Sequence, residues 1–83
     1  MQALDLAVEA IGLDVRPRAV FSPRERDCVA LLVQGYTDEE IAADLEITHA
    51  TVRFHLGGAR RKANARSRTH LAALAVALGV AQP

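Results

Sequence analysis

The sequence predicts a small all-α domain, and three observations support this prediction. Four segments open on a serine or threonine that can cap a helix, namely Ser22, Thr37, Thr48 and Ser67. The apolar residues after these caps recur at helical spacing, whereas no segment shows the alternation of a strand. The chain has 83 residues, of which 51% are hydrophobic. This suffices for one small domain and is too apolar for a disordered chain.

Residues 3–11 are predicted to form a short extra N-terminal helix, followed by a linker over 12–20 that contains a glycine and a proline. The apolar side chains on one face of this helix are Leu4, Ala7, Val8 and Ile11. We therefore divide the chain into an N-terminal helix and linker at 1–20 and a helical domain at 21–83. Three roles stay open for the first helix: packing on the bundle, extending a dimer interface, or docking on another protein.

The second helix is predicted at 23–34. Ser22 and Glu25 have the spacing of a capping box, and Pro23 suits the first turn of a helix. Glu25 is also a candidate to pair with an arginine. Gly35 is expected to end the helix. The apolar side of this helix consists of Cys28, Val29, Leu31 and Leu32.

The third helix is predicted at 38–45, where Thr37 and Glu40 repeat the capping-box pattern. Three acids fill its first turn, which suits the helix dipole. The inward positions are Ile41, Ala42 and Leu45. Residues 46–47 are expected to form a brief turn that leads into the next helix.

Two further helices are predicted at 49–63, capped by Thr48, and at 68–79, which starts after Ser67 and ends at Gly79. In the last helix, the positions expected to face the core are Leu71, Leu74, Ala75 and Leu78. The positions left over are also apolar: Ala72, Ala73, Val76 and Ala77.

A helix that is apolar all round is normally buried all round, and a domain of this size has little with which to cover it. We therefore expect the four left-over positions of the last helix to form a dimer interface. The alternative is an alanine-rich surface, which is tolerable because alanine exposes little area.

The charges of the chain are strongly separated along the sequence. All ten acids lie before residue 47, together with four arginines, whereas residues 47–83 hold six cations and no acid. The net charge of zero therefore hides an acidic first part and a basic second part. A cationic segment without acids is typical of a surface that binds polyanions.

On a helical wheel, the helix at 49–63 has two contrasting faces. Its apolar face contains Val52, Leu56, Ala59 and Ala63. Its opposite face contains Ala50, Arg53, Phe54, Gly57, Arg60 and Arg61. Small side chains permit close approach to a DNA groove, and arginines reach guanine edges or phosphates. An ordinary solvated face is the alternative, but the two capped helices, the short turn and the missing acids favour DNA binding.

At these positions the chain resembles the LuxR/GerE type of helix-turn-helix transcription regulator. The stretches that match are Phe21-Ser22-Pro23-Arg24-Glu25-Arg26, Tyr36-Thr37-Asp38-Glu39-Glu40-Ile41-Ala42, Leu45-Glu46-Ile47-Thr48, Thr51-Val52-Arg53-Phe54-His55-Leu56 and Arg61-Lys62. The resemblance covers about residues 20–80. The sequence departs from the family pattern at Gly57, where a polar or basic residue is usual, at Gly58, where Asn or His is usual, and at Ala63, where leucine is usual.

The resemblance implies a four-helix bundle that binds DNA. It makes 23–34 the scaffold helix and 38–45 the positioning helix. It makes 49–63 the recognition helix, which enters the major groove of a two-fold-symmetric site. The helix at 68–79 becomes the dimerisation helix.

Combining the wheel with the resemblance gives a set of candidate DNA-binding residues: Thr48, His49, Ala50, Thr51, Arg53, Phe54, Gly57, Arg60, Arg61 and Lys62. Arg53 is the principal candidate because it lies at the exposed centre of the recognition helix. Thr48 is first of all a cap. For Phe54 a structural or mixed role is favoured over contact with a thymine methyl. The remaining cations, together with Arg66 and Arg68, are expected to contact phosphates collectively.

Other classes of site find little support in the sequence. The three histidines have no metal-ligand spacing with the single Cys28 or with a carboxylate cluster, so no metal and no cofactor are expected. Cys28 is expected to be a core thiol, and His55 a half-buried histidine. Phosphate-binding loops and nucleophile motifs are absent, so we do not expect an enzyme. Neither a secretory segment nor a membrane span is visible, and we expect a cytoplasmic protein without a membrane partner.

The partners expected are double-stranded DNA and a second copy of the chain, either for a stand-alone regulator or for the output domain of a larger one. As an alternative, the same fold could be a protein-interaction module that uses its last helix to bind another transcription regulator or RNA polymerase. A third interpretation, a region-four-like fragment of a sigma factor, is suggested by residues 58–62. The apolar last helix and the Arg53-Phe54-His55 run argue against it.

Overall fold

The computed structural model describes residues 21–82. In this part of the chain the regular elements are all helices: α3 (Pro23–Val33), α4 (Asp38–Leu45), α5 (His49–Lys62) and α6 (Arg68–Ala77). The predicted all-α class is therefore confirmed. The helix predicted at 3–11 and the linker at 12–20 lie outside the described residues.

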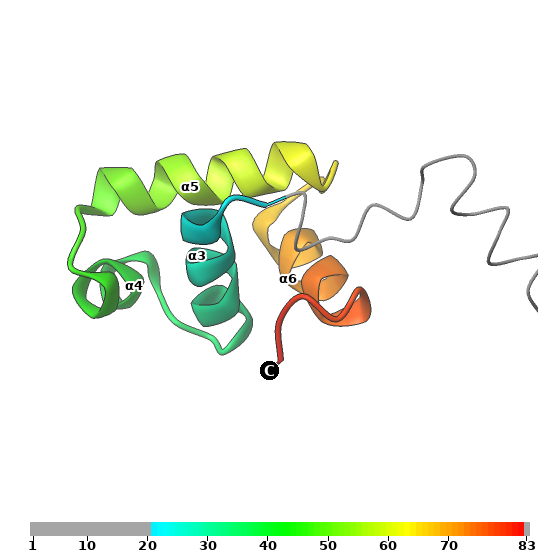
Figure 1. Ribbon diagram of the computed structural model, residues 1–83, viewed down its shortest axis with the longest axis horizontal. Coiled ribbons are helices and arrows are strands. Elements are labelled where there is room, and N and C mark those ends of the chain that lie inside the picture. Colours follow the sequence, from blue (N-terminus) through cyan, green and yellow to red (C-terminus); the bar gives the residue numbers. More distant parts are fainter. Residues whose placement is uncertain (1–20, 83) are drawn as a thin grey trace, which may run out of the picture.

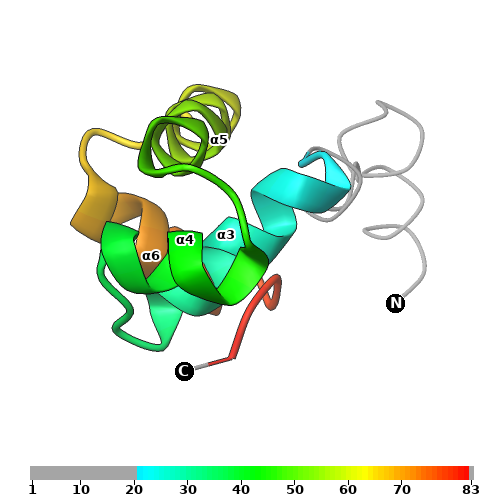
Figure 2. The same cartoon turned by 90° about the vertical axis from the view of Figure 1, so that its left-hand side faces the viewer.

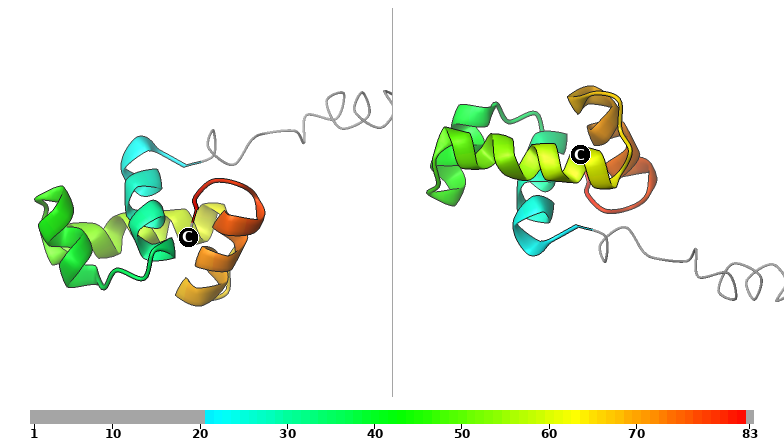
Figure 3. Two further views of the ribbon diagram at one scale, coloured as in Figure 1. Left: turned by 90° about the horizontal axis from the view of Figure 1, so that it is seen from below. Right: turned by 90° about the horizontal axis from the view of Figure 1, so that it is seen from above.

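The helix α3 lies at the centre of the arrangement. It packs against α4, α5 and α6, and α5 in turn packs against both α4 and α6. In Figure 1, α5 runs along the top of the molecule, while α4, α3 and α6 lie beneath it. Figure 2 shows the same layering from one end. The right-hand view of Figure 3 shows that no other helix among residues 21–82 covers the long side of α5 that faces away from the bundle.

Each helix begins at the cap that the sequence predicts. The Ser22 and Thr37 hydroxyls accept from the backbone N–H groups of Glu25 and Glu40, and both capping boxes are complete. The Thr48 and Ser67 hydroxyls likewise accept from backbone N–H groups and so cap α5 and α6. Such local hydrogen bonds satisfy N–H groups that would otherwise lack partners, which explains why the starts of the helices are predictable.

The ends of three helices fall earlier than predicted. The helix α3 ends at Val33, with Gln34 as its cap, and α5 ends at Lys62, with Ala63 as its cap. The difference is largest in α6, which ends at Ala77 rather than at residue 79. Only α4 has the predicted bounds.

One side chain predicted to face the core does not do so. Leu78 is 56% exposed, whereas Leu71 and Ala75 are buried. The chain turns at Gly79, which has a φ of 75°, and Ala81 becomes buried after this turn. Ala81 therefore covers the end of the core, and Leu78 is left at the surface.

The core is built mainly from the predicted inward positions of all four helices. The buried apolar residues are Phe21, Cys28, Val29, Leu32, Ile41, Val52, Leu56, Ala59, Ala65, Leu71, Ala75 and Ala81. Partly buried side chains pack around them, among them Leu31, Ala42, Leu45 and Ala63. Cys28 is a fully buried free thiol, as expected, and burial raises its pKa.

Candidate nucleic-acid interface

The two faces predicted for α5 exist in the structure. Its apolar face is buried in the core through Val52, Leu56 and Ala59. The exposed residues are His49, Ala50, Arg53, Phe54, Arg60, Arg61 and Lys62, while Thr51, His55 and Gly57 are half-buried. We call this side of α5 the outer face. Because all acids of the chain lie before residue 47, α5 supplies no carboxylate of its own to the outer face.

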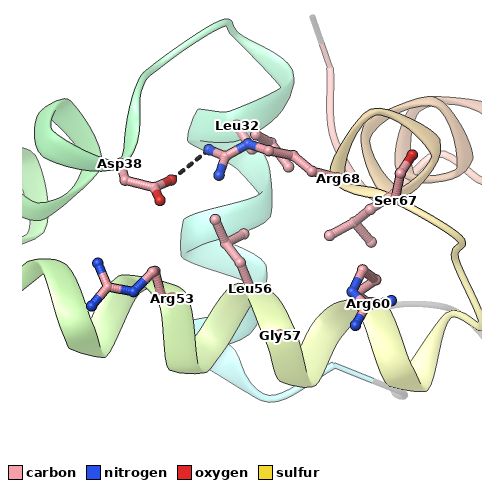
Figure 4. Close-up of a pocket in the computed structure, with 9 residues that line it drawn as sticks. Leu32, Asp38, Arg53, Leu56, Gly57, Arg60, Ser67 and Arg68 are labelled. Carbon is pink, nitrogen blue, oxygen red and sulfur yellow. Dashed lines mark ion pairs between the residues drawn. The ribbon is translucent and has the colours of Figure 1, made fainter.

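Arg53 stands at one edge of the outer face, beside a hollow of about 300 Å³. Side chains from α3, α5 and α6 and the start of α4 line this hollow, including three arginines, Arg53, Arg60 and Arg68. Figure 4 shows that these arginines come from both sides of the hollow, with Asp38 across from Arg53. The basic character of α5 therefore continues onto the first residue of α6.

Asp38 connects three helices at the start of α5. Its carboxylate forms an ion pair with Arg68 of α6, marked in Figure 4, and lies 3.6 Å from Nε2 of His49. The Arg68 guanidinium beside it is the main reason that the pKa of Asp38 lies below its ordinary value of 3.8. His49 and Arg68, two candidate DNA contacts, are thus already held by a carboxylate. From the sequence, Asp38 was expected only to interact favourably with the dipole of its own helix, and these two contacts with other helices were not predicted.

The first turn of α5 is fixed by its threonines. The Thr48 hydroxyl accepts from the Thr51 backbone N–H at 3.0 Å, and the two hydroxyl oxygens lie 2.7 Å apart. The expectation that Thr48 is first of all a cap is confirmed. Both hydroxyls lie at the end of α5 that carries the positive pole of the helix dipole, where a phosphate would be favoured.

Two of the three cations in the last turn of α5 have partners within the protein. Lys62 forms an ion pair with Glu25, with 2.8 Å between Nζ and Oε1. One guanidinium nitrogen of Arg60 lies 3.4 Å from the backbone oxygen of Ala65, to which it donates. Glu25 was expected to pair with an arginine, and its partner is instead this lysine, which lies 37 residues further along the chain.

The Glu25 carboxylate is buried against α5. Burial alone raises its pKa, but hydrogen bonds from Lys62 and from the Ser22 backbone outweigh burial, and the pKa lies below its ordinary value of 4.5. A Cβ atom at Gly58 would lie 2.5 Å from Oε2 of Glu25. Gly58 is therefore the residue that lets the carboxylate approach the helix. A glycine inside a predicted helix could have indicated such a close approach.

Phe54 is the most exposed large apolar residue, with 68% of its surface accessible. Among residues 21–82 its one ring contact is edge-on with His55, 5.5 Å between centroids, and the ring is not sheltered by a neighbour. The structural or mixed role favoured for Phe54 stays a prediction. The half-buried position expected for His55 is confirmed. An exposed ring on the outer face adds apolar area to an otherwise cationic surface.

On α6, three of the four predicted interface residues are exposed: Ala73, Val76 and Ala77. Ala72 is half-buried and packs on the core instead. The exposed Leu78 joins the other three, so an apolar patch forms at the end of α6. We call these four residues the α6 patch.

Among residues 21–82, every helix is too short or too polar to span a membrane. The same residues contain no group of three or more metal-ligating side chains.

A family model described as bacterial regulatory proteins of the luxR family matches residues 19–75. The sequence is also similar to named bacterial regulators. It is 39% identical over 67 residues to the transcriptional activator protein BjaR1 of Bradyrhizobium diazoefficiens, a match that covers 81% of this chain and 28% of the relative. It is 38% identical over 60 residues to the nitrate/nitrite response regulator protein NarP of Escherichia coli, covering 72% of this chain and 28% of the relative.

A third relative is the transcriptional activator protein VanR of Vibrio anguillarum, 34% identical over 70 residues, with 84% of this chain and 29% of the relative covered. The chain thus spans less than a third of the length of these relatives.

Proposed function

The chain belongs to the luxR family of bacterial regulatory proteins, and from this premise we propose that it regulates transcription by binding double-stranded DNA. The observation that supports this most strongly is the outer face of α5. It is cationic, free of acids of its own, exposed in both the first and the second half of the helix, and supported from behind by α3 and α4. A helix with such a face has the dimensions and chemistry to lie in the major groove.

Arg53 and Phe54 are the side chains that we propose to read the sequence. Arg53 is exposed and forms no ion pair within the described residues, so its guanidinium can donate two hydrogen bonds to the O6 and N7 atoms of a guanine. The ring of Phe54 can contact a thymine methyl group. Ala50 and Gly57, small residues on the same face, allow the helix backbone to come close to the bases.

Affinity would come mainly from phosphates. Arg60 and Arg66 are exposed, and Thr48 and Thr51 place hydroxyls at the start of α5. His49 and Arg68 could also contribute, although Asp38 already holds both side chains. Each phosphate that is neutralised releases counterions, and binding should therefore weaken steeply as the salt concentration rises.

We further propose that two copies of the chain pair through the α6 patch. The patch is apolar and exposed, with Val76 at 41% and Leu78 at 56% accessibility. A symmetric pair would present two copies of α5 to a two-fold-symmetric DNA site, which is how dimeric helix-turn-helix proteins commonly bind.

The experiment that tests the function is fluorescence anisotropy with labelled duplexes from a random pool, at several salt concentrations. Wild type is expected to bind with steep salt dependence and to enrich particular sequences. Arg53→Ala should reduce both affinity and enrichment. Arg53→Lys is the matched variant. It keeps the charge but loses the planar guanidinium with its paired N–H donors, so it should retain salt-dependent binding and lose most of the enrichment of particular sequences.

Absence of binding by wild type at low salt would contradict this function for the chain. The second candidate function, a protein-interaction module, would then be preferred. The exposed α6 patch supports it, because such a surface could equally bind another transcription regulator or RNA polymerase. In that case Arg53→Ala would leave the partnership intact.

This function places the protein in the cytoplasm, where bacterial DNA is accessible. It involves binding and no catalytic step, and it needs neither a metal nor another cofactor.

A further inference from the structure

The outer face of α5 has a gap at its centre, where Gly57 supplies no side chain. The next residue, Gly58, also lacks a side chain, but it is buried and faces Glu25 of α3. Gly58 is explained by the Glu25 carboxylate, which occupies the space of its missing Cβ. No such neighbour explains Gly57, because a Cβ at this residue would make only an ordinary contact of 3.6 Å.

That contact is with the guanidinium of Arg61. Nη1 of Arg61 lies 3.6 Å from the Cβ position of Gly57, and Nη2 lies 3.9 Å from that of Gly58. The side chain therefore extends back along α5 over both glycines, in the direction in which helical side chains normally point. The result is that the charge of Arg61 lies about one turn nearer the centre of the helix than its own Cα.

Arg61 differs from the neighbouring cations Arg60 and Lys62 in its bonding partners. Arg60 donates to the backbone oxygen of Ala65, and Lys62 is paired with Glu25. Arg61 is exposed and has neither an ion pair nor a hydrogen bond from its side chain within residues 21–82. Its guanidinium, with five N–H donors in a planar fork, is thus available to a ligand.

We infer that Arg61 reads a base pair, acting from the position that Gly57 leaves empty. This inference rests on the proposed function and names a second base-reading residue beside Arg53. Gly57 follows Arg53 by four residues, which is about 6 Å along the helix axis. The two guanidinium groups can therefore contact guanines in neighbouring base pairs, and the absence of a side chain at Gly57 lets the base edges come close to Arg61.

The test is selection of binding sites from a random duplex pool by the full 83-residue chain, compared between wild type and four variants. Arg61→Lys keeps the charge but loses the fork, and it should reduce the preference at one base pair about tenfold or more. Arg24→Lys is the matched control, because Arg24 is an exposed arginine of α3 outside the proposed interface, and this variant should keep every base preference of wild type.

A third variant tests whether Arg61 acts from its position over Gly57. Gly57→Val fills that place with a branched side chain and removes no cation, so it should weaken the same base preference as Arg61→Lys. The double variant, Gly57→Val with Arg61→Lys, should lose no more of this base preference than either single variant, because both changes act on one contact. If Gly57→Val fails to fold, the comparison of Arg61→Lys with Arg24→Lys still decides the question.

The outcomes are distinguishable from those of the proposed function. Wild type that selects no sequence would overturn the proposed function and this inference together. Wild type that selects a sequence, with an Arg61→Lys variant that selects it equally well, would overturn this inference alone. A uniform loss of affinity for all sequences would overturn it as well, because Arg61 would then only neutralise phosphate.

Discussion

Replacing Gly58 by alanine should destabilise the protein, although alanine is the better helix former. Alanine in place of glycine inside a helix stabilises by about 1 kcal/mol. Against this, the new Cβ would lie 2.5 Å from Oε2 of Glu25, where ordinary contact begins at 3.4 Å. The carboxylate would have to retreat by about 0.9 Å, and its two partners hold it in place.

These partners are Ser22, whose backbone N–H donates to Glu25 at 2.9 Å, and Lys62 at 2.8 Å. Hydrogen bonds to a charged group contribute roughly 1.5–3 kcal/mol each when buried, and less here because Lys62 is 43% exposed. Losing or weakening both should outweigh the gain in helix propensity. We expect a net loss of about 1 kcal/mol or slightly more, which corresponds to a fall in Tm of roughly 4–8 °C.

The measurement is urea and thermal unfolding followed by circular dichroism, at one fixed protein concentration. Gly57→Ala is the matched control, because its Cβ would meet only Arg61 at 3.6 Å. This variant should be stabilised by up to about 1 kcal/mol. The same substitution at two adjacent residues of one helix should thus have opposite signs.

A double-mutant cycle identifies the cause. If Glu25 is first replaced by alanine, Gly58→Ala should no longer destabilise and should become neutral or favourable. A Gly58→Ala variant that is as stable as Gly57→Ala in the wild-type background would refute the reasoning. It would mean that the Glu25 carboxylate can move from α5 without loss of its hydrogen bonds.

Two further predictions concern the same carboxylate and the α6 patch. The pKa of Glu25 is lower in the folded protein than in the unfolded chain, so its contribution to stability is present above about pH 4.5 and lost as the pH falls below its folded value. Glu25→Gln should therefore lose less stability than wild type on acidification from about pH 5 to 3 in urea titrations; an identical loss would exclude Glu25 as a source of the pH dependence. Val76→Asp should shift the chain toward monomer in sedimentation equilibrium, whereas Thr69→Asp, on an exposed residue of the same helix outside the patch, should not. Equal association of both variants would contradict pairing through the patch.

Local features of the fold were predictable from the sequence. The start of each described helix was correct, because a cap and the residue it serves lie within three positions of each other in the chain. The division of α5 into a buried face and an outer face was also correct, since helical periodicity alone defines it. The sequence therefore determined the fold class, the family resemblance and the helix that faces outward.

Contacts between helices were decided only by the tertiary structure. Glu25 meets Lys62 and Gly58, and Asp38 meets Arg68, because α3, α5 and the starts of α4 and α6 pack side by side. No local rule links residues so far apart in the chain. These contacts determine which cations of the outer face remain available to DNA.

The end of α6 and the ring of Phe54 also show that helical periodicity alone does not predict burial. Helical periodicity placed Leu78 in the core, but the helix ends at Ala77 and the chain turns back at Gly79, so that Ala81 covers the core instead. The wheel placed Phe54 on the outer face, but whether a neighbouring helix covers its ring there was decided by the packing, which leaves it exposed. Periodicity defines the direction of a side chain around its own helix, whereas burial depends on what other segments lie opposite, and that is a property of the packed structure alone.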